Sequence, residues 1–246
     1  MKYDIIGDIH GCYNELSQLL IKLGYTMQKG IPVHPNNRSI AFVGDAAARG
    51  PHSLQTLELM FRLQDAHQLI YSPGNHCNKL YRYVKGNKIQ LQYGIETTVA
   101  ELNSLSNKSR LKFIERYIKF YEALSLYYSL DNEKLIIAHA GIREDLIGTT
   151  HSKKLRSFVL YGDVTGEVLP NGRPLRRDWA KQYTGEAFIV YGHTPVAHAR
   201  FINNTVNIDT GCVFGGNLSA IRYPEKDIVS VPSFQPFIAD RFTSFP

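Results

Sequence analysis

YDIIGDIHG, residues 3–11, joins a short apolar run to an aspartate and a histidine that lie between two glycines. Apolar runs of this length, bounded by glycine, are typical of buried β-strands. The same arrangement of a β-rich run and a polar, glycine-containing loop recurs five times: at 39–43 before GDAAARG, 69–72 before PGNHCNK, 135–138 before HAGIR, 188–191 before GHTP and 206–208 before DTGC. Six buried strands, each followed by a polar loop, therefore form the predicted framework of the fold.

Helical patterns lie between the early strands. Residues 13–23 (YNELSQLLIKL) place leucine at 16, 19, 20 and 23, which is the spacing of an amphipathic helix. Pro51 predicts the start of a second helix that runs through Leu63, because proline suits a first helical turn. A third helical region is expected from Glu96 to Leu126, with a break near 104–108. Strands that alternate with helices predict an α/β fold.

The last third of the chain has a different pattern. Residues 205–209, 218–223 and 228–231 are short β-rich runs with turn residues between them, which predicts antiparallel strands at the end of the sheet. Residues 161–186 are rich in glycine and charge and are predicted to form a long surface loop, a kind of segment that is often functional. Because no repeat or linker interrupts the pattern, we expect one domain over residues 1–246.

The composition indicates a globular protein of a reducing compartment. The 246 residues are 43% hydrophobic, yet no apolar run reaches the ~18–20 residues that span a bilayer. The first residues do not resemble a secretory signal, so a cytoplasmic location is expected. Cys12, Cys77 and Cys212 form no CxxC pair and no disulfide framework. A net charge of +6 suits a polyanionic partner, although no block of like charges indicates nucleic acid.

Polar side chains follow each predicted strand. In open α/β sheets, sites form outside the carboxyl ends of the strands, so these side chains are expected to gather at one edge. They comprise two carboxylates, four histidines and an amide: Asp8, His10, Asp45, Asn75, His76, His139 and His193. Such ligands suit manganese, iron, zinc, nickel or cobalt, and they are too many for one tetrahedral ion. Two ions ~3.5–4 Å apart stabilise both oxygens of a phosphoryl displacement, so the sequence predicts a dinuclear, metal-dependent phosphoesterase.

The motifs GDIHG, GDAAARG, GNHCNK, HAGI and GHTP resemble those of the calcineurin-like metallophosphoesterases, in the branch of phosphoprotein phosphatases and diadenosine tetraphosphatases. Longer segments are similar to the bacterial PrpE-type bis(5'-nucleosyl)-tetraphosphatases, which cleave asymmetrically: DIIGDIHGCYNEL (4–16), PGNHCNKLYRYVKGN (73–87), VLYGDVTGE (159–167) and NIDTGCVFGG (207–216). The resemblance implies two mixed β-sheets packed as a sandwich with flanking helices. It also implies hydrolysis of dinucleoside tetraphosphates to a nucleoside triphosphate and a nucleoside monophosphate.

The resemblance further implies two divalent transition-metal ions (manganese, nickel, iron, zinc or cobalt). Asp8, His10 and Asp45 would hold one ion. The other would be held by Asp45, Asn75, His139 and His193, which makes Asp45 the bridge. A hydroxide shared between the ions is the implied nucleophile, because metal ions lower the pKa of bound water.

Other residues receive roles from the same resemblance. His76 is placed to protonate the leaving phosphate oxygen, Arg49 to grip the reacting phosphate and Asp209 to orient a ligand histidine. Arg143 and Arg177 are further expected phosphate contacts, with Lys79 and Arg82 at the distal phosphates and Tyr81 or Tyr83 against a base. For each arginine, the alternative is a surface ion pair.

One position departs from the phosphoprotein phosphatases. Their GD-x-x-DRG motif has a second aspartate that orients the general-acid histidine, and Ala48 stands in its place here. Either activity is reduced, or His76 is oriented by other means. Symmetrically cleaving diadenosine tetraphosphatases are similar in having alanine, which favours the second possibility. Because a nucleoside polyphosphate leaves more readily than a serine alkoxide, Ala48 favours an anhydride substrate.

Three other functions remain open from the sequence. A phosphoprotein phosphatase would use the same two-metal site. A nucleic-acid end-healing phosphatase carries similar VYGHTP and IDTGCVFGG motifs, but it is joined to kinase and ligase modules that 246 residues do not accommodate. A non-catalytic binding protein would not need the full ligand set. The expected partner is a dinucleoside polyphosphate or a phosphate ester, with no membrane and no stable nucleic-acid complex; the native metals and the oligomeric state stay open.

Overall fold

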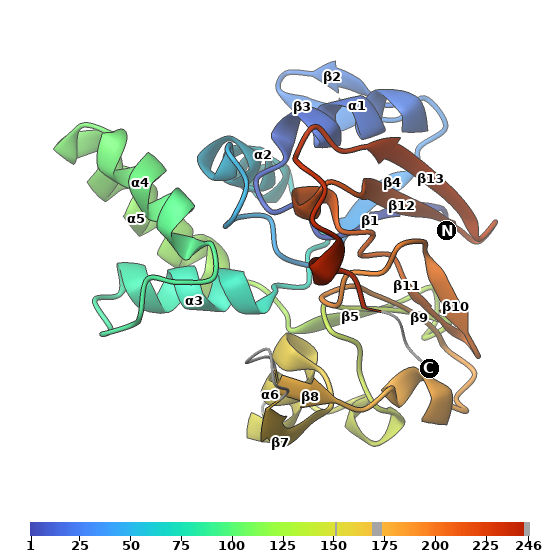
Figure 1. Cartoon of the computed structure of the whole chain (residues 1–246). Coiled ribbons are helices and arrows are strands. Elements are labelled where there is room, and N and C mark those ends of the chain that lie inside the picture. Colours follow the sequence, from blue (N-terminus) through green and yellow to red (C-terminus); the bar gives the residue numbers. More distant parts are fainter. Residues whose placement is uncertain (151, 169–173, 244–246) are drawn as a thin grey trace.

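Two mixed β-sheets lie at the centre of the molecule (Figure 1). The computed structural model describes residues 1–150, 152–168 and 174–243. The first sheet has the order β13-β12-β1-β4, from Asp227–Pro232, Asn217–Tyr223, Tyr3–Ile6 and Ser39–Phe42. The second has the order β10-β11-β9-β6-β5, from Arg200–Ile202, Thr205–Asn207, Phe188–Tyr191, Leu135–Ala138 and Tyr127–Leu130. Strands β1 and β4 run parallel, as do β6, β9 and β11.

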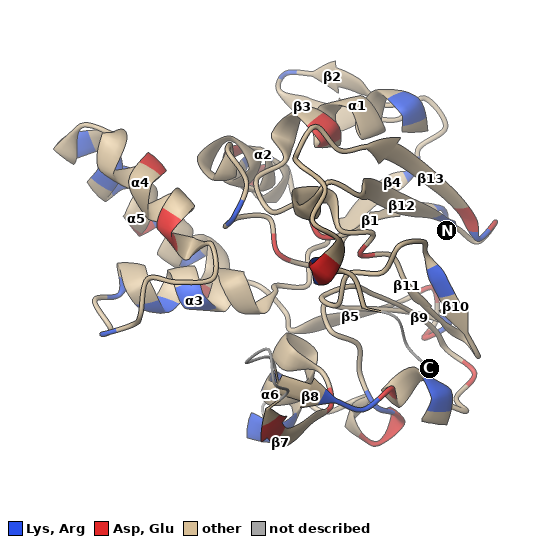
Figure 2. Ribbon diagram, in the orientation of Figure 1, with Lys and Arg blue, Asp and Glu red and all other residues tan. Residues whose placement is uncertain are grey.

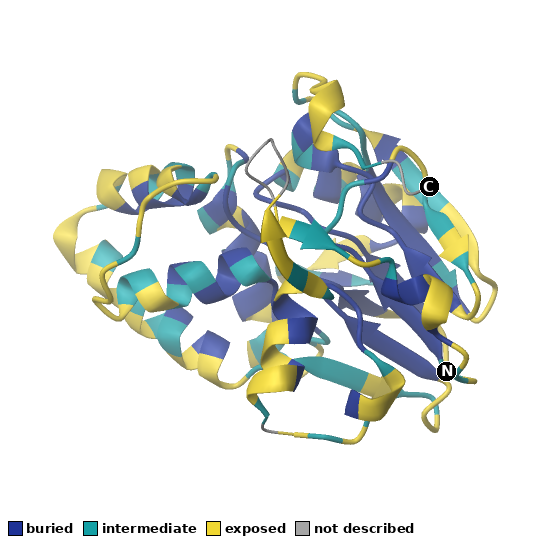
Figure 3. Ribbon diagram, turned by 60° about the horizontal axis from the view of Figure 1, so that its bottom comes forward, coloured by how far each residue is buried: buried dark blue, intermediate teal, exposed yellow. Residues whose placement is uncertain are grey.

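The two sheets pack face to face. Successive side chains of a strand point to opposite faces, and neighbouring residues here enter different cores. In β1, Ile5 belongs to the core between the sheets, whereas Ile6 packs in the core that contains the residues of α1 and α2. In β9, Val190 faces the first sheet and Ile189 packs with residues of α6. The central strands β1, β6, β9 and β11 are accordingly buried, as the dark blue strands in Figure 3 illustrate, and the expected sandwich with flanking helices is confirmed.

Six α-helices surround the sheets in the described part of the chain: α1 Tyr13–Leu23, α2 Ser53–Asp65, α3 Asn75–Val84, α4 Ile95–Ser104, α5 Asn107–Glu122 and α6 Lys153–Tyr161. Helix α1 has the predicted bounds, and the predicted break in the third helical region separates α4 from α5. Helices α3, α4 and α5 project together to one side of the sheets (Figure 1). Among the described helices, none is both long and apolar enough to cross a bilayer.

Two predicted elements have different bounds in the structure. The expected strand at 69–72 is reduced to a single bridge between Tyr71 and Phe42, because Pro73 follows and has no N–H to extend the pairing. Helix α2 begins at Ser53 rather than near Pro51. The carboxylate of Glu101 accepts hydrogen bonds from the N–H groups of Ser53 (2.8 Å) and Leu54 (3.0 Å), and it therefore caps the helix from α4.

The strands expected to close one sheet are divided between two sheets. Strand β11 pairs in parallel with β9 in the second sheet. Strands β12 and β13 are antiparallel in the first sheet, and β12 lies inside that sheet, beside β1. The sequence indicates where these strands occur. The passage of the chain from the second sheet after β11 to the first sheet at β12 is decided by how the two sheets pack.

The expected loop at 161–186 contains regular structure. Strands β7 (Val164–Val168) and β8 (Pro174–Arg176) form a hairpin, and a 3₁₀ helix follows at Trp179–Gln182. Trp179 is buried in the core on the outer face of the second sheet, which fixes the segment after the hairpin. Residues 169–173 lie outside the described residues. The glycines and charges in this segment masked the apolar residues that anchor it, Trp179, Ala180 and Tyr183.

Candidate metal centre and catalytic cleft

The parallel strands of both sheets end at the same place, and the polar side chains that follow them meet there. Strand β1 leads to Asp8 and His10, and β4 leads to Asp45. In the second sheet, β6 and β9 lead to His139 and His193. Asn75 and His76 come from the first turn of α3, a helix that the sequence interpretation had treated as loop.

Asp45 lies between two of the histidines. Its Oδ1 accepts hydrogen bonds from the N–H groups of His76 (2.9 Å) and Cys77 (3.2 Å), at the N-terminus of α3. Its Oδ2 lies 3.9 Å from His10 Nε2 and 3.7 Å from His139 Nε2. One carboxylate oxygen is therefore fixed by the helix, where a negative charge is favoured, and the other faces both imidazoles.

A second group of ligand atoms converges on His139. Its Nε2 lies 3.2 Å from Asn75 Oδ1 and 3.0 Å from His193 Nδ1. Two ligands at right angles on ~2.1 Å bonds to one ion would be ~3.0 Å apart, so these spacings suit a metal ion. His139 Nδ1 lies 3.2 Å from the carbonyl of Val43, and His10 Nδ1 lies 3.1 Å from that of Ala47. When Nδ1 donates to a carbonyl, Nε2 is the ligand nitrogen.

Asp8 supplies an oxygen without a hydrogen-bond partner. Its Oδ2 accepts from the N–H of His193 (3.0 Å), while the buried Oδ1 has no hydrogen bond among the described residues. Burial raises the pKa of both Asp8 and Asp45 to about 6. Burial, followed by the nearby Asp8, also raises the pKa of Asp209. A cation would favour the charged form of all three carboxyls, so the donor set fits divalent metal ions.

The backbone around these ligands is strained. His10 (φ 49°), Ala48 (φ 77°), Arg49 (φ 72°) and His193 (φ 73°) adopt left-handed conformations that non-glycine residues rarely adopt. Such strain gathers at functional sites, where the surrounding packing holds it. The glycine of GNHCNK has a packing role, because a Cβ at Gly74 would overlap the Asp45 carboxylate.

His76 has no carboxylate partner in the part of the chain that the structure describes. It is buried, its Nδ1 has no hydrogen-bond partner among the described residues, and its ring lies edge-on to that of His10 at 5.0 Å. Burial holds the pKa of His76 well below its ordinary value, and the charge of Arg49 adds to this effect. Ala48 instead uses its N–H to bond the hydroxyls of Ser53 (3.1 Å) and Thr98 (3.0 Å). The orienting aspartate of the phosphoprotein phosphatases is thus absent in space as well as in sequence.

Residues 1–222 match the family model for calcineurin-like phosphoesterases. The chain belongs to the calcineurin-like phosphoesterase family. The resemblance seen in the motifs is thereby confirmed, and metal ions are implied for a metallophosphoesterase. Among the described residues, Asp8, Asp45 and His139 form a buried cluster whose ligand atoms lie within 4.8 Å of one another.

Curated relatives of this metallophosphoesterase match it over the full length. A protein of Halalkalibacterium halodurans is 54% identical over 246 residues, and one of Anoxybacillus flavithermus is 55% identical over 245 residues, with 100% of each chain covered. Both are named bis(5'-nucleosyl)-tetraphosphatase PrpE [asymmetrical].

Solved structures share the fold at lower identity. A protein assigned as a diadenosine tetraphosphatase superposes with a TM-score of 0.66 at 24% identity, covering 95% of this chain and 94% of that one. A protein serine/threonine phosphatase from Saccharomyces cerevisiae gives 0.64 at 15% identity, covering 98% and 82%.

Arg49 and Asp209 complete the centre of this metallophosphoesterase. An Arg49 Nη1 atom lies 2.6 Å from His10 Nε2, and its guanidinium carbon lies 5.1 Å from the Phe214 ring centroid. Burial lowers the pKa of Arg49, while Asp45, Asp209 and Asp8 act in the opposite direction. Asp209 is buried beside Asp8, and its Oδ1 accepts from the N–H of Gly211 (3.1 Å). The Arg49 guanidinium is therefore under the influence of three carboxylates.

A cleft of about 1130 Å³ opens from the metallophosphoesterase centre and carries an excess of basic side chains. Figure 2 shows basic residues on α3 and at β8, the two sides of this cleft. Its basic lining comprises Arg49, Lys79, Arg82, Lys88, Arg176, Arg177 and Arg241. Sequence reasoning had named Arg49, Lys79, Arg82 and Arg177. It missed Arg176, although this residue adjoins Arg177 in the RPLRRDW segment, and it missed Lys88 and Arg241, which are recognised only by their place along the cleft.

Three other sequence-predicted contacts lie elsewhere. Arg143 is held in a bidentate ion pair with Asp145 (2.8 and 2.7 Å), which is the surface ion pair considered as its alternative. Tyr81 stacks on Tyr121 at 4.4 Å and lines a different cavity. Tyr83 packs against the core formed with α3 and α5. None of the three is among the described residues that line the catalytic cleft.

Proposed function

We propose that this chain hydrolyses dinucleoside tetraphosphates asymmetrically, releasing a nucleoside triphosphate and a nucleoside monophosphate. The full-length relatives that share 54% and 55% of its residues carry that activity in their name. The observation that carries the chemistry is the position of Asp45 Oδ2, 3.9 Å from one histidine nitrogen and 3.7 Å from another. This placement supports a carboxylate bridge between two cations.

Two divalent ions would be held by the residues described above, with Asp8, His10 and Asp45 at one position. Asp45, Asn75, His139 and His193 would hold the second ion. When bound, the ions supply Lewis acidity at the reacting phosphate and lower the pKa of a coordinated water. Nitrogen and oxygen ligands of this kind accept manganese, nickel, iron, zinc or cobalt.

The protein side chains position the substrate. Arg49 presents its planar guanidinium to two oxygens of the reacting phosphate, a geometry that suits bidentate hydrogen bonding. His76, kept neutral by burial, donates a hydrogen bond to the leaving phosphate oxygen. A polyphosphate leaving group needs little protonation, so a neutral imidazole without a carboxylate partner is sufficient. Asp209 is buried beside Asp8, where burial raises its pKa, and bound cations would favour its charged form; its role in orienting a ligand histidine remains part of this proposal.

The test is to incubate the purified, manganese-loaded protein with diadenosine tetraphosphate and to separate the products by chromatography. Equal amounts of ATP and AMP are expected. ADP as the sole product would refute asymmetric cleavage, and intact substrate would refute the proposed function. A phosphopeptide assayed in parallel decides against the phosphoprotein phosphatase alternative if its kcat/KM is lower than that of the dinucleotide.

A further inference from the structure

The side of the cleft formed by α3 and the segment 88–93 extends the site beyond the metal centre. His76, Lys79 and Arg82 all line the cleft and follow one another at three-residue intervals on α3. Residues at this spacing share one face of a helix and lie about 4.5 Å apart along its axis. A chain of phosphates that leaves past His76 would therefore meet Lys79 and then Arg82.

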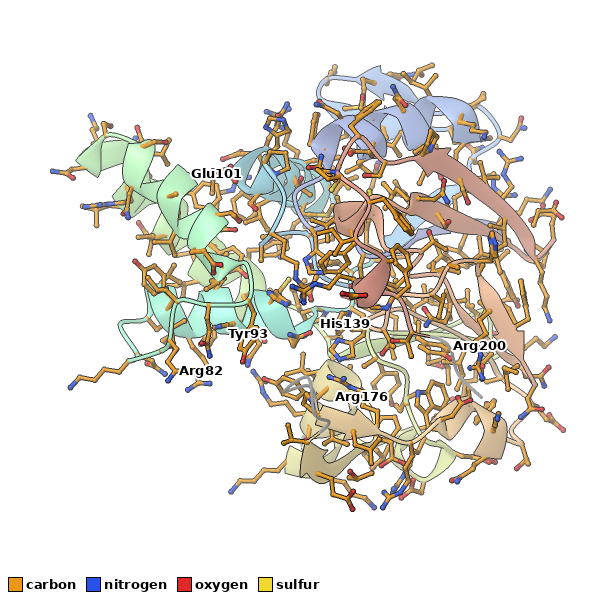
Figure 4. All side chains as sticks on the ribbon, viewed as in Figure 1. Arg82, Tyr93, Glu101, His139, Arg176 and Arg200 are labelled. Carbon is orange, nitrogen blue, oxygen red and sulfur yellow. The ribbon has the colours of Figure 1, made fainter. Side chains whose placement is uncertain are left out.

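Tyr93 stands on the same side and presents an open aromatic ring. Its side chain is 69% exposed, compared with 37% for Tyr161, 9% for Phe214 and 8% for Trp179, which also line the cleft. The Phe214 ring is already covered by the guanidinium groups of Arg49 and Arg241, at 5.1 and 5.5 Å. Figure 4 shows Tyr93 and Arg82 on the α3 side, with Arg176 on the β8 side.

Lys79 is fixed against Tyr93. Its Nζ donates to the carbonyl of Gln92 (2.7 Å) and lies 5.4 Å from the centroid of the Tyr93 ring. An ammonium group has three donors, and this hydrogen bond uses one of them. The ammonium group thus covers one face of the Tyr93 ring, and because Tyr93 is 69% exposed, a nucleobase can stack on the opposite face while Lys79 binds the adjoining phosphates.

The position of Tyr93 is tied to the catalytic arginine. Tyr93 has a left-handed backbone (φ 66°), and the next residue, Gly94, has a φ of 94°. The Gly94 carbonyl accepts from the N–H of Arg49 (2.7 Å), and a Cβ at Gly94 would overlap the Arg49 side chain. This strained turn therefore sets the aromatic ring at a fixed place relative to the residue proposed to hold the reacting phosphate.

We propose that Tyr93 and Lys79 form the subsite for the distal nucleoside, where the base of the leaving nucleoside triphosphate stacks on the Tyr93 ring and Lys79 binds its phosphates. This inference rests on the proposed function and deepens it. Because His76 adjoins the leaving oxygen, the leaving group follows α3 toward Tyr93. The cations along that helix match three phosphates better than one, which gives a physical reason for asymmetric cleavage.

The test compares two substrates that differ only in the distal nucleoside, diadenosine tetraphosphate and adenosine 5'-tetraphosphate. Wild type, Tyr93→Ala, Tyr93→Phe and Leu91→Ala are assayed with manganese at equal metal content. Leu91 is the matched control, because it is 47% exposed in the same segment but does not line the cleft. Tyr93→Ala is expected to lower the kcat/KM ratio between the two substrates about tenfold, mainly through KM, as the loss of stacking predicts.

Tyr93→Phe keeps the ring and should keep the wild-type ratio, as should Leu91→Ala. An unchanged ratio in Tyr93→Ala overturns the subsite, as does an equal loss in Leu91→Ala. Equal losses in Tyr93→Phe and Tyr93→Ala would assign the effect to the hydroxyl and overturn stacking. If wild type leaves diadenosine tetraphosphate intact, the proposed function itself has failed, a result distinct from failure of the subsite.

Discussion

Replacing Asp45 by asparagine should change the stability of this protein in opposite directions in the metal-free and metal-loaded states. Without metal, the Asp45 carboxyl is buried and its pKa is raised to about 6. An aspartate whose pKa rises from about 4 in the unfolded chain to this value costs the folded state roughly 2–3 kcal/mol at pH 7. Asparagine keeps the shape of the side chain and removes the charge.

The metal-free Asp45→Asn protein should therefore melt about 5–8 °C above metal-free wild type at pH 7. The full cost of the carboxylate applies above pH 6, shrinks as the pH falls and vanishes below about pH 4, where both states are protonated. The difference in melting temperature between variant and wild type should follow that course. Circular dichroism melts of chelator-treated protein at pH 7, 6, 5 and 4 provide the measurement.

Manganese should reverse the order. A ligand present at 100 times its Kd stabilises the folded state by about 2.7 kcal/mol per site, so wild type should gain the most. Metal analysis should find about two ions per chain in wild type and less than one in Asp45→Asn. Asp227→Asn, an exposed carboxylate in β13, is the control and should match wild type in both states. Full metal occupancy in Asp45→Asn would refute the bridge, and a lower metal-free melting temperature would refute the electrostatic reasoning.

Two further predictions concern the helices that frame the site. His76→Ala removes one hydrogen bond to the leaving phosphate oxygen and should lower kcat by about 10–100-fold while metal analysis still finds both ions; unchanged turnover would remove His76 from the mechanism. Glu101→Ala removes both hydrogen bonds that cap α2 and should lower the free energy of unfolding by roughly 2 kcal/mol in denaturant titrations. Its control is Glu115→Ala, whose carboxylate pairs with Lys119 on the exposed face of α5; an equal loss in both would contradict the capping role.

Much of the candidate site could be predicted from the sequence, because its polar residues follow short apolar runs that are typical of β-strands. Each predicted ligand directly follows a short apolar run, and parallel strands bring their carboxyl ends to one edge. Asp8, Asp45, His139 and His193 could therefore be named without coordinates. Asn75 and His76 were named on the same grounds but were expected in a loop. They begin helix α3 instead, because the Asp45 carboxylate accepts hydrogen bonds from the first N–H groups of that helix and caps it.

The sequence by itself indicated the central strands, the expected ligand types and the alanine at position 48, because these depend on residue identity and on short-range periodicity. Only the tertiary structure decided which cations reach the cleft and which aromatic ring remains open. Arg143 and Tyr81 looked suitable in the sequence but are held by Asp145 and Tyr121. Tyr93 belongs to no motif, and its place follows from a backbone turn that packs against Arg49 across 44 positions of chain (93 − 49). Contacts between segments so far apart depend on how the elements pack, and no local pattern records them.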